Sequence, residues 1–125
     1  MHRHLLVIGT SLLLIGLLLG TILDWFSSSS VAADAHVAGV QHGMVLMILG
    51  LSWKYAHLGS AEILCSALNV LGLVGIWTAF LIGAIIGDPY PSASTVTYLM
   101  FVTSSSLLIV GVSIFLFGLY RGTDG

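Results

Sequence analysis

Long apolar stretches separated by short polar segments dominate the pattern along the chain. Four of these stretches contain no aspartate, glutamate, lysine or arginine, and they cover residues 5–23, 35–53, 63–86 and 95–119. A helix of about 19 to 25 residues, rising about 1.5 Å per residue, spans a hydrocarbon core of about 30 Å. The strands of a membrane barrel would instead alternate polar and apolar residues over about ten positions. The pattern therefore predicts four membrane-spanning helices.

The segments between the predicted helices are short, and they determine the expected topology. Residues 89–92 contain two prolines and a serine, which indicate a turn before the last helix. Short connections place sequential helices side by side and antiparallel. We therefore expect a single all-α domain over residues 1–125, an integral membrane four-helix bundle in up-down-up-down order.

The first apolar stretch has a second interpretation, that of a cleaved signal peptide. Arg3 precedes the stretch, and the small residues Ala32, Ala33 and Ala35 follow it. Its apolar run is longer than the usual signal-peptide core of about 7–15 residues. A retained span is therefore the preferred interpretation.

Charged residues are few and unevenly placed. They make up 6% of a chain that is 58% hydrophobic, whereas a soluble domain carries about 25%. The positive residues are Arg3, Lys54 and Arg121, and the aspartates between the spans are Asp24, Asp34 and Asp88. Four spans would place the positive residues on one side of the bilayer and these aspartates on the other. By the positive-inside rule, we expect both termini in the cytoplasm.

The composition also excludes several classes of function. The net charge is −2 and there is no basic run, so the sequence predicts no nucleic-acid partner. The single cysteine, Cys65, excludes an intrachain disulfide and a multi-cysteine metal site. The spans hold no acid to complete a Ser-His-Asp arrangement, and no glycine-rich phosphate loop is present. Any catalytic or binding site is therefore expected between the helices.

Polar residues inside the spans are the candidates for that chemistry. They include His36, Gln41 and His42 in the second span and Asn69 in the third. Such groups are costly in hydrocarbon and usually face the interior of the bundle or a cavity.

His36 is the first candidate, as a metal ligand. It is expected near the start of the second helix, after Asp34 or Ser30 as the N-cap, where the positive helix end favours the neutral imidazole that binds metals. Gly39 and Gly43 follow on the same helical face, which predicts a flat surface against which a macrocycle can bind. The alternative is a helix-packing motif, in which the glycines admit a neighbouring helix and His36 only hydrogen-bonds across helices.

His42 is not expected to share a metal ion with His36. It lies six residues further along, which is roughly 120° around the helix and about 9 Å along it. His42 is therefore expected to face a substrate or a different helix. Asn69 is a second candidate catalytic residue, with an interhelical hydrogen bond as the alternative. Trp77 lies on the same side of that helix, as a packing residue or as the wall of an aromatic substrate site.

Residues 35–53 resemble the second span of the hydroxylaminobenzene mutase family, whose members are small four-helix membrane enzymes. The likeness is carried by Ala35-His36 at the start of the span and by Gln41-His42-Gly43-Met44 further along. Styrene oxide isomerase, another small membrane protein, has a similar pattern. The relatives carry asparagine where His42 stands, so the resemblance leaves the substrate open.

The resemblance implies haem b with His36 as the axial iron ligand and His42 near the reacting end. It transfers no role to Asn69. It implies a homo-oligomer in the lipid bilayer, a trimer in the resembling isomerase, that acts on a small aromatic substrate. The expected reaction is a redox-neutral conversion of a hydroxylaminoarene to an aminophenol, in which an open iron position acts as a Lewis acid. Epoxide isomerisation, a non-catalytic membrane haem protein and a structural subunit are the alternatives.

Overall fold

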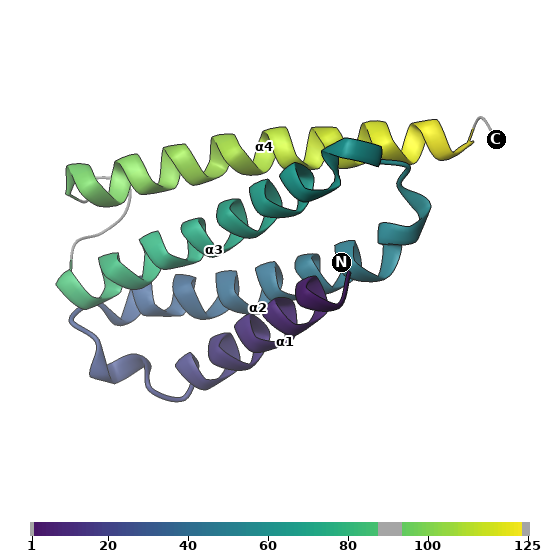
Figure 1. Cartoon of the computed structure of the whole chain (residues 1–125). Helices are drawn as coiled ribbons and strands as arrows, with labels where there is room; N and C mark the ends of the chain where they lie inside the picture. Colours follow the sequence, from purple (N-terminus) through teal and green to yellow (C-terminus); the bar gives the residue numbers. More distant parts are fainter. Residues whose placement is uncertain (1, 88–93, 124–125) are drawn as a thin grey trace.

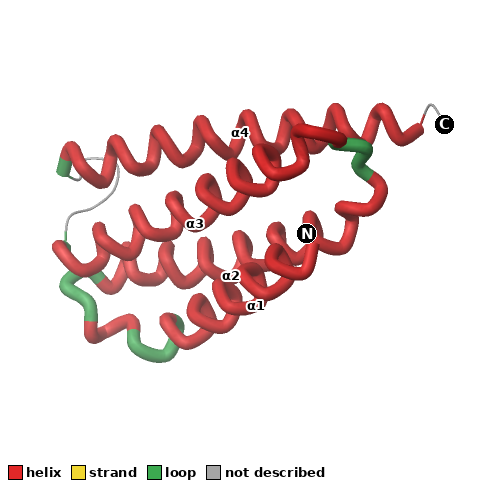
Figure 2. Tube along the Cα trace, in the orientation of Figure 1, coloured by secondary structure: helices red, strands yellow, loops and turns green. Residues whose placement is uncertain are grey.

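The structure, a computed structural model, describes residues 2–87 and 94–123, and its regular elements in these ranges are all helical. The α-helices are α1 (His2–Leu19), α2 (Ser29–Ser52), α3 (Glu62–Ile86) and α4 (Thr95–Thr123) (Figure 1). The short helices η1 (Leu23–Trp25), η2 (Trp53–Tyr55) and η3 (Gly59–Ala61) lie in the connections (Figure 2). The predicted all-α class is confirmed. The turn predicted at residues 89–92, and Asp88, lie outside the described residues.

Helix α2 begins earlier than its apolar run indicated. The Oγ atom of Ser28 accepts a hydrogen bond of 3.4 Å from the backbone N–H of Val31, so Ser28 is the N-cap. This corrects the expectation that Asp34 or Ser30 caps the helix. His36 consequently lies beyond the first turn, where the field of the helix end has faded. The expected effect of the helix end on His36 therefore does not apply.

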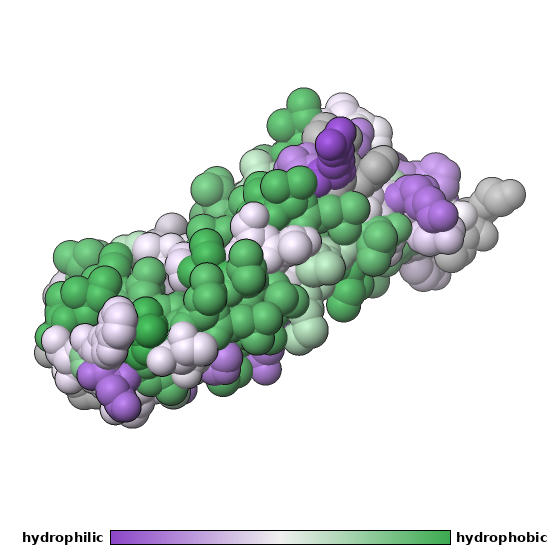
Figure 3. Space-filling view, turned by 90° about the horizontal axis from the view of Figure 1, so that it is seen from below, coloured by the Kyte–Doolittle hydropathy of each residue, from purple (hydrophilic) through white to green (hydrophobic). Residues whose placement is uncertain are grey.

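Three helical segments are long and apolar enough to cross a membrane, by length and composition. They are Ser29–Tyr55, Gly59–Ile86 and Thr95–Gly122, and the apolar part of α1, Arg3–Leu19, is shorter. In the space-filling view, apolar residues cover the middle of the visible face and hydrophilic ones gather chiefly toward its ends (Figure 3). The structure is therefore compatible with a multi-pass membrane protein, and the crossing by α1 stays a prediction.

The α-helices form a row in chain order. α1 packs on α2, α2 on α3 and α3 on α4, and α1 and α4 lie at opposite edges of the row (Figure 1). Successive helices run in opposite directions in this view, and the start of α1 and the end of α4 lie on the side of η2. The positive residues Arg3, Lys54 and Arg121 therefore lie at one end of the molecule, as predicted. Which end faces the cytoplasm stays a prediction.

Glycines bring α1 and α2 into close contact. A methyl group added at Gly16 would lie 2.7 Å from the backbone nitrogen of Val40, and one added at Gly43 would lie 2.6 Å from the carbonyl oxygen of Gly9. Backbone atoms cannot rotate away as side chains do, so only glycine permits this approach. The α1–α2 contact is the first of the two features that position the candidate site.

Trp53 is the second feature, and it is buried among three helices. It is 3% exposed, and its indole N–H donates a hydrogen bond of 3.1 Å to a carboxylate oxygen of Glu62. Its ring lies 5.4 Å from that of Phe115, between centroids. Trp53 thus joins the ends of α2, α3 and α4, whereas Trp25 is 83% exposed, as an interfacial ring would be.

Candidate functional site

His36 lies on the face of α2 that packs against α1. Its Nδ1 atom is 2.6 Å from the carbonyl oxygen of Gly16. Because a carbonyl oxygen only accepts, Nδ1 carries the proton and donates, and the Nε2 atom of a neutral ring keeps its lone pair. Among the described residues Nε2 has no hydrogen-bond partner. Histidines that bind metals commonly donate the other ring N–H to a carbonyl in this way.

The glycines beside His36 are covered by α1. A methyl group added at Gly39 would lie 2.8 Å from the Cα atom of Gly16, and one added at Gly43 would lie 2.6 Å from backbone atoms of α1. Within this chain the surface is therefore not open to a macrocycle. This corrects the expected open groove, and the alternative, a helix-packing motif, describes what the structure contains.

His42 lies on the opposite side of α2 and contacts α3. Its Nδ1 atom is 3.0 Å from the carbonyl oxygen of Leu73 and donates to it. His36 and His42 thus face different helices, as the helical period predicted. Both rings use Nδ1–H to bind a backbone carbonyl, so each neutral ring presents Nε2 as the remaining acceptor.

A polar cavity of about 380 Å³ opens beside His42. It is lined by Asp34, Val37, Ala38, Gln41, His42 and Phe80. The Phe80 ring stands edge-on to the Phe101 ring of α4, with centroids 6.0 Å apart. A carboxylate, an amide and an imidazole therefore meet an aromatic wall in this cavity, which we call the His42 cavity.

Four residues of the His42 cavity, Asp34, Val37, Ala38 and Phe80, were not predicted as site residues. All lining residues except Phe80 come from α2, at a spacing that places them on one helical stripe. The spacing of these residues on α2 is a signal in the sequence that could have indicated this part of the cavity. The contribution of Phe80 needed the packing of α3 on α2, which no local pattern contains.

Asn69 lies away from the His42 cavity. It is fully buried, and its Nδ2 donates a hydrogen bond of 2.8 Å to the carbonyl oxygen of Cys65 in its own helix. A methyl group added at Gly111 of α4 would lie 2.9 Å from Nδ2, so the side chain is at the α3–α4 contact. The Oδ1 atom has no partner among the described residues. The structure thus does not bring the two candidate catalytic residues together within one chain.

Trp77 lies in the groove between α1 and α3. Together with Ile8, Leu12 and Val74 it lines a cavity of about 240 Å³ that is mostly apolar. Its buried indole N–H has no acceptor among the described residues, and the indole nitrogen would lie 3.0 Å from a methyl group added at Gly39. Trp77 therefore packs against α2 at Gly39 and does not line the His42 cavity.

His4 is a histidine whose environment the sequence did not indicate. It is partly buried, and its Nε2 atom lies 2.7 Å from the hydroxyl oxygen of Ser66 on α3. The hollow beside it is otherwise lined by aliphatic residues. No acid completes this pair among the residues that line the hollow, so it connects α1 to α3.

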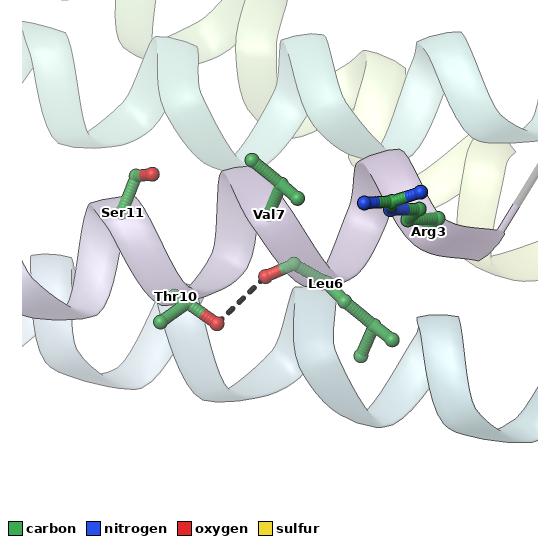
Figure 4. A pocket seen from close by; sticks show the side chains of 5 residues that line it. All are labelled: Arg3, Leu6, Val7, Thr10 and Ser11. Carbon is green, nitrogen blue, oxygen red and sulfur yellow. Dashed lines mark hydrogen bonds between the residues drawn. The ribbon is translucent and has the colours of Figure 1, made fainter.

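Another concavity lies along α1. Its lining residues, Arg3, Leu6, Val7, Thr10 and Ser11, all come from this one helix (Figure 4). The Thr10 hydroxyl donates a hydrogen bond of 2.7 Å to the Leu6 carbonyl, so it is already satisfied. No groups from different helices converge there. Nor do three or more His, Cys, Asp or Glu side chains gather as a metal-binding group anywhere in residues 2–87 and 94–123.

Comparison with known proteins gives one informative similarity. The chain is 36% identical over 86 residues to the hydroxylaminobenzene mutase HabB of Ectopseudomonas oleovorans. The match covers 68% of this chain and 52% of that protein, so the chain spans about half the length of the curated relative. No protein-family model matches the chain, and no solved structure matches it significantly. The similarity to HabB supports a mutase-family relationship for this chain, and it confirms the predicted resemblance to the hydroxylaminobenzene mutases.

Proposed function

We propose that this chain is a membrane-bound intramolecular isomerase that converts a hydroxylaminoarene to an aminophenol, with haem b held by His36. The similarity to a protein named hydroxylaminobenzene mutase carries the proposal. The hydrogen bonds of the two imidazole rings support it, because in each ring Nδ1 donates to a backbone carbonyl and a neutral ring then keeps its Nε2 lone pair.

The hydrogen bonding of His36, and not the covered glycine surface beside it, fits a residue that would hold a haem iron. The hydrogen bond from Nδ1 to the Gly16 carbonyl fixes the tautomer in which Nε2 can bind a metal. Gly39 and Gly43 act indirectly in this proposal, because they admit α1 and thereby bring the Gly16 carbonyl to His36. When bound, a ferric haem with one protein ligand supplies a Lewis-acidic open position for a substrate oxygen.

The His42 cavity fits the polar end of a one-ring arene. A hydroxylamino group offers N–H and O–H donors, and the cavity offers the Nε2 lone pair of His42, the Gln41 amide and the Asp34 carboxylate as acceptors. Phe80 provides an edge for the ring. These groups would bind and orient the substrate while the apolar surroundings exclude water.

The proposed rearrangement is balanced without any co-reactant. The N–O bond breaks, a C–O bond forms at a ring carbon, that carbon loses a proton and the nitrogen gains one. A single base that accepts the ring proton and returns it to nitrogen is sufficient. We assign this transfer to Nε2 of His42, whose Nδ1 proton is held by the Leu73 carbonyl. No role in this transfer follows for Asn69, which lies at the α3–α4 contact.

A homo-oligomer in the bilayer belongs to the same proposal. Helix α4 lies at the edge of the row with exposed apolar residues, among them Ile109, Leu116 and Phe117. His36 and His42 face different helices, so an oligomer would combine the two groups only if it placed the His42 cavity of one chain near the His36 of another. A trimer is the form that the resembling isomerase implies.

The test is turnover by the detergent-purified protein. We expect hydroxylaminobenzene to give an aminophenol under anaerobic conditions without an added reductant. In ¹⁸O-labelled water the product should carry the unlabelled oxygen of the substrate, because the rearrangement is intramolecular. Absence of aminophenol, or product oxygen drawn from the solvent, would contradict the proposal.

Two variants assign the proposed roles. His36→Ala should abolish the Soret band and the activity together. His42→Ala should keep the Soret band and lower kcat by about 10²-fold or more, the usual contribution of acid–base catalysis. Val37→Ala, which also changes the wall of the His42 cavity, serves as the matched control. Turnover of styrene oxide in place of the hydroxylaminoarene would favour the epoxide isomerase, and a ligand-insensitive six-coordinate spectrum would favour a haem protein without catalysis.

A further inference from the structure

The ring of His36 lies in a recess that Gly16 of α1 and Gly20, just after the end of α1, create. Gly16 supplies the carbonyl oxygen that accepts from Nδ1 at 2.6 Å. Gly20, one turn later on the same face of the chain, leaves the space that the ring fills. A methyl group added at Gly20 would lie 2.8 Å from both Cε1 and Nδ1 of His36, and 3.3 Å from Nε2. No rotation about the Cα–Cβ bond of an alanine moves that methyl carbon away.

The Gly16 carbonyl is available because α1 ends close by. Helix α1 ends at Leu19, and the last carbonyls of a helix lack full intrahelical partners. The backbone N–H of Gly20 reaches the Gly16 carbonyl at 3.4 Å and the Leu17 carbonyl at 3.2 Å, so its bond to Gly16 is long and shared. His36 therefore makes the shorter hydrogen bond to this oxygen.

We infer that Gly16 and Gly20 are positioning residues for the iron ligand. The Gly16 carbonyl selects the tautomer with the proton on Nδ1, and the absence of a side chain at Gly20 lets the ring present Nε2 for coordination. This inference rests on the proposed function, because it assigns to α1 the orientation of the imidazole that would bind haem. The inference adds a role for α1: this helix contributes no catalytic side chain, but its contact with His36 determines whether the chain can hold the cofactor.

A purely structural role for the same contact makes a different prediction. If His36 only satisfies the end of α1, then Gly20→Ala lowers stability and leaves the cofactor content of the folded protein unchanged. If Gly20 positions the ligand, then the folded variant loses haem. Haem content per folded protein therefore separates the two roles, and it does not depend on turnover.

The experiment compares Gly20→Ala with Gly72→Ala as a matched control. The methyl group added at Gly72 meets an equally close neighbour, 2.7 Å from the Cβ atom of Leu108, but at the α3–α4 contact. Each protein is purified in detergent, loaded with haem b and separated from aggregates by gel filtration. The Soret absorbance per folded protein is then measured. We expect at least a ten-fold loss for Gly20→Ala and wild-type content for Gly72→Ala.

Nitrogen NMR of the haem-free protein gives the second readout. In the full-length protein labelled with ¹⁵N-histidine, His36 is assigned from the resonances that disappear in His36→Ala. We expect Nδ1 of the wild type to be the protonated nitrogen and Nε2 the unprotonated one. In Gly20→Ala we expect this single tautomer to be replaced by an averaged pair of resonances.

Three results would overturn the inference. They are a wild-type His36 with the proton on Nε2, wild-type haem content in folded Gly20→Ala, and a wild-type protein that takes up no haem. The last result would also remove the haem from the proposed function. By contrast, a wild type that holds haem through His36 but produces no aminophenol would refute the proposed activity and leave the positioning role intact.

Discussion

The close approach of α1 and α2 gives the sharpest prediction about stability. In Gly43→Ala the new methyl group would lie 2.6 Å from the Gly9 carbonyl oxygen and from the Leu13 backbone nitrogen. Both atoms belong to the backbone of α1, so the two helices must separate. Overpacking of this kind costs about 1–3 kcal/mol, and alanine regains about 0.8–1.0 kcal/mol over glycine inside a helix. The net destabilisation should be about 0–2 kcal/mol.

Gly118→Ala is the control for this prediction. Its methyl group would lie equally close to a neighbour, 2.6 Å away, but that neighbour is the terminal Cδ2 atom of Leu58, which can rotate. The helix propensity gain should then dominate, with a stabilisation of up to about 1 kcal/mol. Titration with SDS from mixed micelles, followed by circular dichroism, measures both free energies of unfolding. The reasoning is refuted if the two variants shift the unfolding midpoint equally.

Other contacts make separate predictions. Ser28→Ala should lower the free energy of unfolding by about 1 kcal/mol through loss of the α2 N-cap, and an unchanged SDS midpoint would show that the cap contributes nothing. Trp53→Phe should cost about 0.5–1.5 kcal/mol, because the carboxylate of Glu62 loses its indole donor; a comparable loss is expected for Glu62→Ala and none for Glu62→Gln. Asn69→Ala should leave turnover per folded protein near the wild-type value while His42→Ala lowers it, and equal losses in the two variants would place both residues in one site.

The helices could be predicted from the sequence, but their ends and contacts could not. Uninterrupted apolar runs indicated all the α-helices, because hydrocarbon requires an internally bonded backbone. The predicted start of α2 was wrong. The actual start depends on the Ser28 side chain and lies in a polar run that hydropathy does not indicate as helix. The different directions of His36 and His42 followed from the helical period alone.

The partners of these residues required tertiary structure. A glycine stripe such as Gly39 and Gly43 fits a macrocycle or a helix equally well, and only the position of α1 distinguishes the two. The same limit applies to Phe80, which reaches the His42 cavity from another helix. Sequence spacing gives the direction of a side chain around its own helix, and it says nothing about which neighbour lies there.

In this chain, backbone carbonyls accept the Nδ1–H hydrogen bonds of both His36 and His42, and the depth of these residues in the predicted span explains why. In soluble metal and acid–base sites a carboxylate often holds the second ring nitrogen. Residues 35–53 contain no carboxylate, since a charge at that depth is costly. Carbonyls of neighbouring helices are the acceptors that remain, and both His36 and His42 use them. Such a bond forms only where a helix comes close enough, so the glycines that permit helix approach also determine the state of the imidazole. A variant that separates α1 from α2, such as Gly43→Ala, should therefore weaken haem binding at His36 without touching the ring, and it should leave the hydrogen bond of His42 to α3 unchanged.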